Sequence, residues 1–252
     1  MTRHYGLIGM PVAHSLSPKF FEHYCSEHNI TDCLYSLYPV EAALLQREAL
    51  HRWVEEQGLQ GFNVTIPYKR SIIPSLDSLS DEARAIGAVN CVVASHDNGR
   101  LLLTGHNTDA TAFEQTLRPL LRENHRAALI LGTGGAAQAV AYVLGRLGID
   151  YLFVSRTPWQ TPQAVSYPQA IEQADYRTLI VNATPVGMAP DSDSTPWPDS
   201  DLLTPRHLCY DLIYNPSPTR FLREAAAQGA TTIDGSQMLS LQAQHSYRLW
   251  QI

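Results

Sequence analysis

Lys69 lies in the segment GFNVTIPYKR, at a place where a positive charge is unexpected. Residues 61–66 alternate apolar and polar side chains, as a half-buried strand does, with Asn63 and Thr65 on the polar face. Pro67 then ends the strand, and we expect it to open a helix that holds Lys69 in its first turn. The N-terminus of a helix disfavours a cation, so an amine held there releases its proton readily. This pattern makes Lys69 a candidate general acid and base.

Asp109 is expected to lie at one end of a hairpin. Asn98-Gly99 is the favoured two-residue type I′ turn between two strands. Strands that pair around this turn set Asn90 opposite Asn107, and Asp109 follows two residues later. We therefore expect the side chains of Asn90 and Asp109 to be neighbours at one end of the hairpin. From the residues alone, Asp109 could instead cap a helix that starts at residue 110, and Asn90 could satisfy only the hairpin end.

A glycine-rich turn in LILGTGGAAQAV predicts a dinucleotide site. The segment reads as strand, loop and helix, and its spacing fits G-x-G-x-x-G/A. Gly132 allows the tight turn, Gly134 lets a pyrophosphate approach the backbone, and Ala137 permits close packing of helix on strand. Gly135 and Ala136 complete the loop, so we include them among the cofactor-binding candidates.

The end of the next strand indicates which dinucleotide binds. An NAD site carries an acidic residue there for the ribose hydroxyl, but this strand ends in Ser155, Arg156 and Thr157. Asp150 precedes the strand and is misplaced for that purpose. Arg156 suits a 2′-phosphate and can stack on adenine, which favours NADP over NAD. The alternative is that Arg156 is only a solvated strand end.

Strands and helices alternate along the chain, and the pattern changes near residue 110. Before it, the sequence predicts strands at 5–9, 33–40 and 61–66 and helices at 17–30, 41–58 and about 80–86, with Ser17 and Gly58 as caps. After it, we expect strands at 127–132, 151–156, 178–184 and 207–214, helices at 110–121, 135–148, 219–229 and 240–252, and a mobile surface loop at 189–201. Such alternation is typical of an α/β fold with a parallel, doubly wound sheet.

Composition excludes several classes of protein. The 252 residues carry a net charge of −6 with no basic run, which argues against a nucleic-acid or membrane partner. No apolar stretch approaches the roughly 20 residues that span a bilayer. The four cysteines lack metal-ligand spacing. We therefore expect reduced thiols in a cytoplasmic enzyme that holds no metal.

Nine segments, in order, resemble the shikimate dehydrogenase family across nearly the whole chain. They are HSLSP (14–18), NVTIPYK (63–69), IGAVN (86–90), NTD (107–109), GTGGAA (132–137), SRT (155–157), NATPVGM (182–188), DLIYNPSPT (211–219) and GSQMLSLQA (235–243). The resemblance implies an enzyme that reduces 3-dehydroshikimate to shikimate with NADPH, in the pathway through chorismate to aromatic amino acids.

The resemblance also implies a two-domain organisation. Residues 1–108 are expected to form a substrate-binding domain and residues 109–235 a Rossmann-type NADP-binding domain. The closing helix, 236–252, is expected to pack back on the first domain. The substrate and cofactor are the expected partners, with the chain a monomer or homodimer.

Site residues carry over position by position. Lys69 and Asp109 match the family's catalytic pair. Its substrate-contact positions, with Asn63 added from the polar face of its strand, are Ser15, Ser17, Asn63, Thr65, Asn90, Tyr214 and Gln242. Three further residues match cofactor positions, of which the last two line the nicotinamide end: Thr184, Gly235 and Met238.

Ser17, Gln242 and the activity itself each have an alternative interpretation from the sequence. Ser17 before Pro18 would cap a helix with or without a ligand, and Gln242 on an amphipathic helix would usually be a surface residue. A quinate/shikimate dehydrogenase that uses NAD is an alternative in the same class. A ligand sensor that has lost catalysis is an alternative in another class, although the intact Lys69 and Asp109 speak against it.

Overall fold

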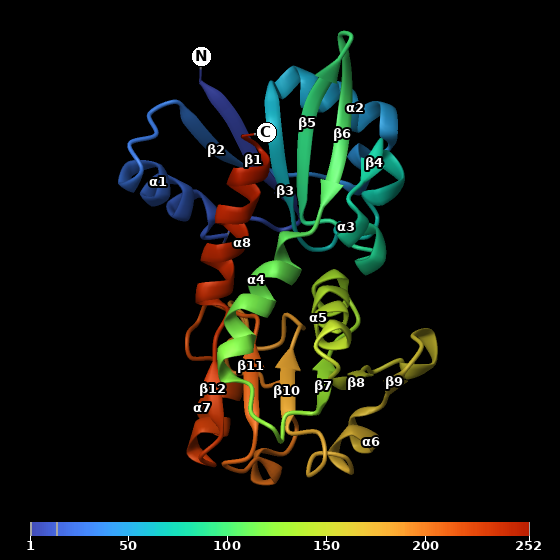
Figure 1. Ribbon diagram of the computed structural model, residues 1–252, viewed down its shortest axis with the longest axis vertical. Coiled ribbons are helices and arrows are strands. Elements are labelled where there is room, and N and C mark those ends of the chain that lie inside the picture. Colours follow the sequence, from blue (N-terminus) through green and yellow to red (C-terminus); the bar gives the residue numbers. More distant parts are fainter. Residues whose placement is uncertain (1, 14, 252) are drawn as a thin grey trace. The chain divides into compact units, whose positions relative to one another are not determined.

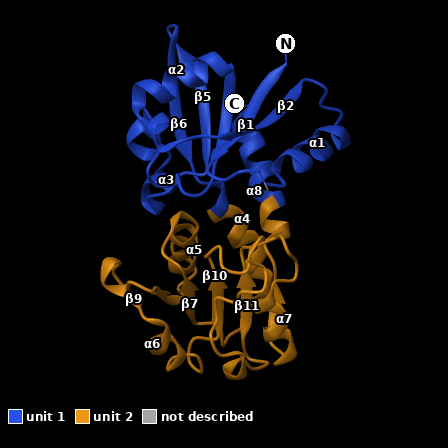
Figure 2. Ribbon diagram, turned by 180° about the vertical axis from the view of Figure 1, so that it is seen from behind, with its two compact units in different colours: residues 1–109, 240–252 blue, residues 110–239 orange. Residues whose placement is uncertain are grey.

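The computed structural model describes residues 2–13 and 15–251, so His14, the first residue of the HSLSP segment, lies outside them. The chain divides into two compact units (Figure 2). Unit 1 comprises Met1–Asp109 and Ser240–Ile252, and unit 2 comprises Ala110–Leu239. The chain passes from one unit to the other inside helix α4 (Thr108–Leu117) and inside helix α8 (Ser236–Leu249).

Unit 1 contains a mixed six-stranded sheet in the order β2-β1-β3-β5-β6-β4 (Figure 1). Its strands are β1 (Arg3–Gly9), β2 (Cys33–Pro39), β3 (Leu59–Val64), β4 (Ser78–Leu79), β5 (Cys91–Asp97) and β6 (Arg100–His106). Strand β1 pairs in parallel with both β2 and β3, so the strand order reverses between β1 and β3. Ligands bind at the carboxyl ends of strands at such a switch point.

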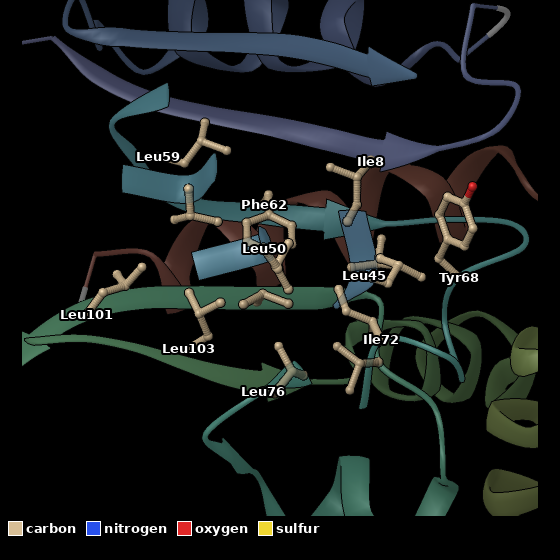
Figure 3. Packing of buried hydrophobic residues seen from close by; sticks show 14 of the residues in the cluster. Ile8, Leu45, Leu50, Leu59, Phe62, Tyr68, Ile72, Leu76, Leu101 and Leu103 are labelled. Carbon is tan, nitrogen blue, oxygen red and sulfur yellow. The ribbon is translucent and has the colours of Figure 1, made fainter. Parts of the chain in front are cut away.

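The two faces of this sheet have different cores. Phe62 and Val64 point to the face covered by α2 (Arg47–Gln57), where the cluster in Figure 3 packs. Asn63 points to the opposite face, where Phe21 of α1 (Ser17–Glu27), Tyr247 of α8 and Trp250, which follows α8, pack together. The alternation predicted for this strand therefore holds to Val64. Ile66 lies beyond the strand and is 54% exposed, so its placement on the apolar face was wrong.

Local geometry changes two further expectations in unit 1. The predicted helix 41–58 is split into the 3-10 turn η1 (Ala42–Leu45) and α2, because Gln46 between them is extended. Gly58 ends α2 in the left-handed conformation, as predicted. The short helix predicted near residue 80 is α3 (Asp81–Ile86), which Ser80 caps by accepting a hydrogen bond from Ala83 N.

The hairpin of β5 and β6 has the predicted register. Asp97 pairs with Arg100 across a turn in which Asn98 and Gly99 both have positive φ, the requirement of a type I′ turn. Cys91 pairs with His106 at the other end, and Asn90 N donates to His106 O at 3.1 Å. This end lies at the same edge of the sheet as the carboxyl end of β3, because β5 is antiparallel to β3.

Unit 2 is a parallel sheet in the order β12-β11-β10-β7-β8-β9. The strands are β7 (Ala127–Leu131), β8 (Asp150–Val154), β9 (Ala164–Val165), β10 (Leu179–Asn182), β11 (Leu208–Asp211) and β12 (Thr231–Ile233); the helices beside them are α5 (Gly135–Arg146), α6 (Tyr167–Ile171) and α7 (Arg220–Ala227). The strand order reverses between β7 and β10. Both sheets confirm the α/β fold class and the doubly wound second sheet.

Two segments of unit 2 differ from expectation. Strand β9 and helix α6 were not predicted, and each is only a few residues long. The stretch 189–201, expected to be a mobile loop, is fixed at Trp197, whose side chain is buried in the unit 2 core. Its indole Nε1 donates to Asp199 O at 2.7 Å. A lone Trp in a polar stretch carries no periodic signal, so only the packing shows its place.

Candidate active site

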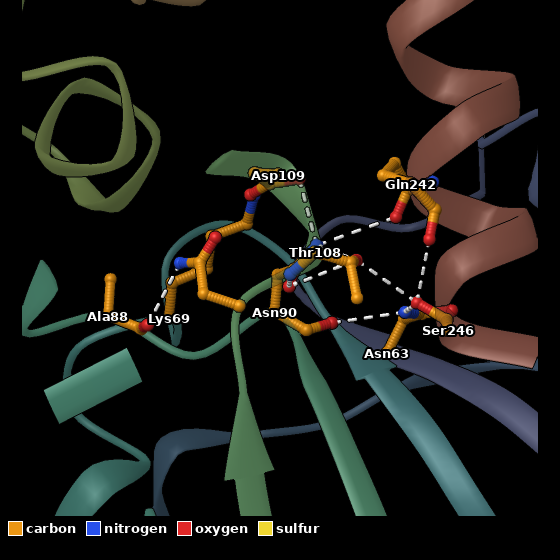
Figure 4. Close-up of polar contacts among 9 residues, drawn as sticks. Asn63, Lys69, Ala88, Asn90, Thr108, Asp109, Gln242 and Ser246 are labelled. Carbon is orange, nitrogen blue, oxygen red and sulfur yellow. Dashed lines mark hydrogen bonds and ion pairs between the residues drawn. The ribbon is translucent and has the colours of Figure 1, made fainter. Parts of the chain in front are cut away.

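Lys69 and Asp109 form an ion pair at the carboxyl edge of the unit 1 sheet (Figure 4). Lys69 Nζ donates to Asp109 Oδ2 at 2.6 Å, and the two side chains are 16% and 7% exposed. Both groups lie in unit 1 and come from segments 40 residues apart. The resemblance to the family implied that these two residues form a pair, and the structure contains that pair.

The helix predicted to start at Pro67, with Lys69 in its first turn, was wrong. Residues 65–72 form turns, and no α-helix starts after Pro67 within this described segment. Lys69 therefore does not sit at a helix N-terminus. Its backbone is held by the next segment instead, since Lys69 O accepts from Val89 N at 2.7 Å. The ammonium is placed by Asp109 rather than opposed by a helix dipole.

Asn90 links the Lys69–Asp109 pair to Thr108 at the start of helix α4. Its Nδ2 donates to Asp109 Oδ1 at 2.8 Å and lies 2.9 Å from Thr108 Oγ1, while its Oδ1 accepts from Thr108 N at 2.7 Å. Both carboxylate oxygens of Asp109 are thus bonded to side chains. Helix α4 begins at Thr108, so Asp109 lies in its first turn rather than just before a helix that starts at residue 110, and its carboxylate pairs with Lys69 and Asn90.

Gln242 joins the same group from α8. Its Oε1 lies 3.5 Å from Asn90 Nδ2, and its side chain is half-buried rather than on the open surface. Gln242 belongs to the part of α8 that falls in unit 1. The structure therefore brings Gln242 together with Asn90, although they are 152 residues apart in sequence.

Asn63 connects Asn90 to helix α8 through buried hydrogen bonds. Its Nδ2 donates to Asn90 O at 3.1 Å and to Ser246 Oγ at 2.8 Å, and its Oδ1 accepts from Tyr35 Oη at 2.9 Å. Both amide hydrogens are therefore used inside the protein, and the residue is buried. We interpret Asn63 as a residue that holds Asn90 in place, where the sequence suggested a substrate contact.

Ser246 and Thr108 are site residues that the sequence reasoning missed. Ser246 Oγ accepts from Asn63, lies 3.2 Å from Thr108 Oγ1 and donates to Gln242 O at 2.9 Å. A serine inside an amphipathic helix is an ordinary feature of a sequence. Its four-residue spacing from Gln242 was the available signal, since residues at i and i+4 share a helix face.

Ser15, Ser17 and Thr65 follow the carboxyl ends of β1 and β3. Ser15 Oγ accepts from Ser17 N at 3.2 Å and lies 3.1 Å from Ser17 Oγ, so the two hydroxyls are adjacent. Ser17 is the first residue of α1 and Leu16 occupies the N-cap position without a side-chain bond, so Ser17 is not the predicted cap. Paired hydroxyls at a switch point suit a carboxylate ligand.

The glycine turn of unit 2 has the geometry of a pyrophosphate cradle. Gly132 has φ +102°, which a side chain rarely adopts. Gly134 is the N-cap of α5 without a side-chain bond, and a Cβ there would meet no atom within 4 Å. Open space beside uncapped N–H groups is what a pyrophosphate requires, so Gly132, Gly134, Gly135 and Ala136 fit a dinucleotide.

Arg156 follows β8, which pairs in parallel with β7. The glycine turn follows β7, so Arg156 and the glycine turn come after the carboxyl ends of neighbouring strands. The side chain of Arg156 is exposed. Burial raises the pKa of Tyr167, and the positive charge of Arg156 acts against that rise. Thr157 N donates to Ser155 Oγ at 3.1 Å, which shapes the turn beside it. An exposed guanidinium beside the cradle suits a 2′-phosphate.

The remaining candidates also lie in unit 2. Thr184 Oγ1 donates to Asn182 Oδ1 at 2.7 Å, and Tyr214 is half-buried after β11. Met238 is buried in α8. A Cβ on Gly235 would lie 2.1 Å from Leu212 O, so close backbone packing requires glycine there whether or not it contacts a cofactor.

The chain is similar to known proteins along nearly its whole length. The family model of the shikimate dehydrogenase substrate binding domain matches residues 7–92. A shikimate dehydrogenase (NADP(+)) from Salinibacter ruber is 41% identical over 267 residues, covering 97% of this chain and 90% of the relative. The chain belongs to the shikimate dehydrogenase family.

Solved structures extend the likeness to the whole fold. Shikimate 5-dehydrogenase from Thermus thermophilus, in complex with NADP(H) and shikimate, has a TM-score of 0.84 at 35% identity, covering 99% of this chain and 93% of that one. Shikimate dehydrogenase 1 from Peptoclostridium difficile has a TM-score of 0.86 at 31% identity, covering 99% and 92%.

Other side chains of the described residues offer little competing chemistry. Cys25, Cys33, Cys91 and Cys209 are free, and burial raises the pKa of Cys91 and of Cys209 to about 12, which makes them poor nucleophiles. Within residues 2–13 and 15–251, no three His, Cys, Asp or Glu side chains gather as a metal site would require. The same residues contain no helix with the length and apolarity to cross a membrane.

Proposed function

We propose that this protein catalyses the reversible NADPH-dependent reduction of 3-dehydroshikimate to shikimate, in the pathway to chorismate and the aromatic amino acids. The observation that carries the proposal is the Lys69–Asp109 pair, joined to Asn90 at the carboxyl edge of the unit 1 sheet. When bound, the nicotinamide supplies or accepts the hydride.

Lys69 stabilises and protonates the reacting oxygen. Reduction of a ketone builds negative charge on that oxygen, and a nearby ammonium lowers the energy of this charge and then transfers a proton to it. In the reverse direction the neutral amine removes the hydroxyl proton. Asp109 holds the amine at 2.6 Å, and can also accept a hydrogen bond from a substrate hydroxyl.

The other polar groups of unit 1 bind the substrate. Ser15 and Ser17 hold the carboxylate through their hydroxyls, Thr65 and Asn90 contact ring hydroxyls, and Gln242 contributes from α8. Tyr214 of unit 2 is a further substrate contact. The residues that bind NADP are Gly132, Gly134, Gly135, Ala136, Arg156, Thr157, Thr184, Gly235 and Met238. Accordingly, unit 1 is the substrate domain and unit 2 the cofactor domain, so the boundary lies after Asp109, one residue later than expected from the sequence.

The test is a steady-state assay of 3-dehydroshikimate reduction with NADPH and with NADH, and of shikimate and quinate oxidation with NADP+ and NAD+. We expect the highest kcat/KM for 3-dehydroshikimate with NADPH. Faster turnover of quinate with NAD+ would replace the proposal by a quinate/shikimate dehydrogenase. No turnover with any pair, together with ligand binding, would favour a sensor.

The cellular setting follows from the same proposal. The four free cysteines fit a reducing compartment, and we infer that the enzyme acts in the cytoplasm as a monomer or homodimer. Light scattering of the purified protein would distinguish these two states.

A further inference from the structure

Asp211 is a buried carboxylate that the proposed mechanism does not use. It ends strand β11 and has no exposed surface. Its Oδ1 accepts from Asn182 Nδ2 at 2.9 Å and from Ile213 N at 3.0 Å, and its Oδ2 accepts from Thr219 Oγ1 at 2.7 Å. None of these donors is charged. Burying a carboxylate among neutral donors is costly, so the group calls for a reason beyond packing.

The contacts of Asn182 show where Asp211 acts. Asn182 ends β10, and its Oδ1 accepts from both Thr184 N at 3.0 Å and Thr184 Oγ1 at 2.7 Å. Thr184 Oγ1 in turn accepts from Val186 N at 3.2 Å. The side chain of Asn182 therefore shapes the turn that follows β10. Its Nδ2 has two acceptors, Asp211 Oδ1 at 2.9 Å and Val186 O of the same turn at 3.3 Å, and Asp211 is the nearer one.

This turn lies against the glycine turn. Strand β10 pairs with β7, and Ala183 N donates to Leu131 O at 3.0 Å. A Cβ on Gly132 would meet Thr184 Cγ2 at 2.9 Å and Ala183 O at 3.2 Å. The turn thus forms the second wall of the switch point between β7 and β10, where a dinucleotide binds a doubly wound sheet.

A carboxylate is better suited than an amide to orient Asn182. Ionised Asp211 can only accept hydrogen bonds, so the NH₂ of Asn182 must face it and the oxygen of Asn182 must face Thr184. An amide at position 211 could present either its oxygen or its NH₂, which would leave the orientation of Asn182 less certain.

We propose that Asp211 is a positioning residue for cofactor binding, which acts through Asn182 on the Thr184–Val186 turn. This inference rests on the proposed NADP site of unit 2. The two oxygens of the carboxylate have different partners. Oδ1 orients the Thr184–Val186 turn, here called the cofactor turn, through Asn182. Oδ2 accepts a hydrogen bond from Thr219, the N-cap of α7.

The chain therefore offers a matched pair of variants. D211A removes the bonds from Asn182, from Ile213 N and from Thr219, whereas T219V removes only the bonds of the Thr219 hydroxyl, to Asp211 and from Leu222 N, and leaves the Asn182 bond in place. Both variants lose buried hydrogen bonds, so both are expected to unfold at lower temperature. Only D211A is expected to alter the cofactor turn.

The experiment measures the Kd of NADP+ by isothermal titration calorimetry on the full-length protein, below the unfolding temperature of each variant. We expect D211A to raise Kd about tenfold, the size of one lost buried hydrogen bond. D211N keeps an acceptor for Asn182 and should recover most of the affinity. T219V should stay within about twofold of the wild type, and KM for shikimate should change little in all three.

The outcomes separate this inference from the proposed function. A wild-type protein that does not bind NADP+ would contradict the proposed function itself. A wild type that binds, with D211A and T219V changing Kd equally or not at all, would show that Asp211 serves only the stability of unit 2. N182A should reproduce the D211A effect, and the double variant should add little to it.

Discussion

Asp109 and Asp211 are both buried aspartates at strand ends, but their surroundings differ. Asp109, 5% exposed, follows β6 in unit 1 and accepts from a cation, Lys69, and from the amide of Asn90. Asp211, fully buried after β11 in unit 2, accepts only from neutral groups. The first carboxylate is part of an ion pair, and in the proposed mechanism the amine of this pair exchanges a proton with the substrate. The second is sealed from solvent and can only hold other groups in position.

The largest effect is expected when Lys69, the cation that contacts Asp109, is removed. K69A should lower kcat by about 10³-fold, because the reacting oxygen loses its proton donor, while shikimate affinity stays within several-fold. It also leaves Asp109 buried among neutral donors, as Asp211 is. Steady-state kinetics and calorimetric binding of shikimate measure the two effects. K19A, which removes an exposed lysine of α1, is the control; wild-type turnover in K69A would remove Lys69 from the mechanism.

A smaller effect is expected when the charge of Asp109 is removed and its shape is kept. D109N should lower kcat by about 10- to 100-fold and raise KM for shikimate, because Lys69 loses the anion that holds it. An unchanged kcat in D109N would mean that Asp109 only positions the backbone of α4.

Asp211 should show its effect in stability against pH. Burial raises its pKa from 3.8 to about 6. Between about pH 4 and pH 6 the folded protein keeps a proton that the unfolded chain has released, so the free energy of unfolding falls as pH rises. The loss is at most about 3 kcal/mol and is complete above about pH 6.

D211N cannot ionise and should escape this loss. Relative to the wild type, its stability should be similar near pH 4 and higher near pH 7. Asp234, which also raises the pKa of Asp211, and the neighbouring thiol of Cys209 are unchanged in the variant. Urea unfolding of both proteins at several pH values measures the difference, and a difference that is constant with pH would contradict the assignment.

The smallest effect is expected for Ser246, which accepts a hydrogen bond from Asn63 and so helps to hold Asn90, the neighbour of Asp109. S246A leaves Asn63 Nδ2 without one of its acceptors and should cost about 1–3 kcal/mol of stability. Because Asn63 also holds Asn90, KM for shikimate should rise a few-fold while kcat changes little. Thermal unfolding and steady-state kinetics test this together. A change in kcat alone would mean that the α8 contact acts on Lys69 rather than on Asn90.

Much of the fold could be predicted because its signals are local. The Asn98-Gly99 turn determines the register of β5 and β6, and that register brings Asn90 to Asp109. Gly132 and Gly134 mark the dinucleotide turn by spacing alone. By contrast, Pro67 was a misleading signal, because proline suits both the start of a helix and a turn. Trp197 could not be placed, since a single apolar residue has no period.

By itself, the sequence determined the α/β class, the family and most of the polar residues at the strand ends, since these depend on residue type and short spacing. Only the tertiary structure decided which of them have hydrogen-bonding capacity left. Asn63 uses its amide on Ser246, Asn90 and Tyr35, and Asp211 is tied to Asn182 and Thr219, through contacts between residues far apart in the chain. Hydrogen bonds are limited in number and direction, so a side chain satisfied by distant partners takes a different role from the one its type suggests.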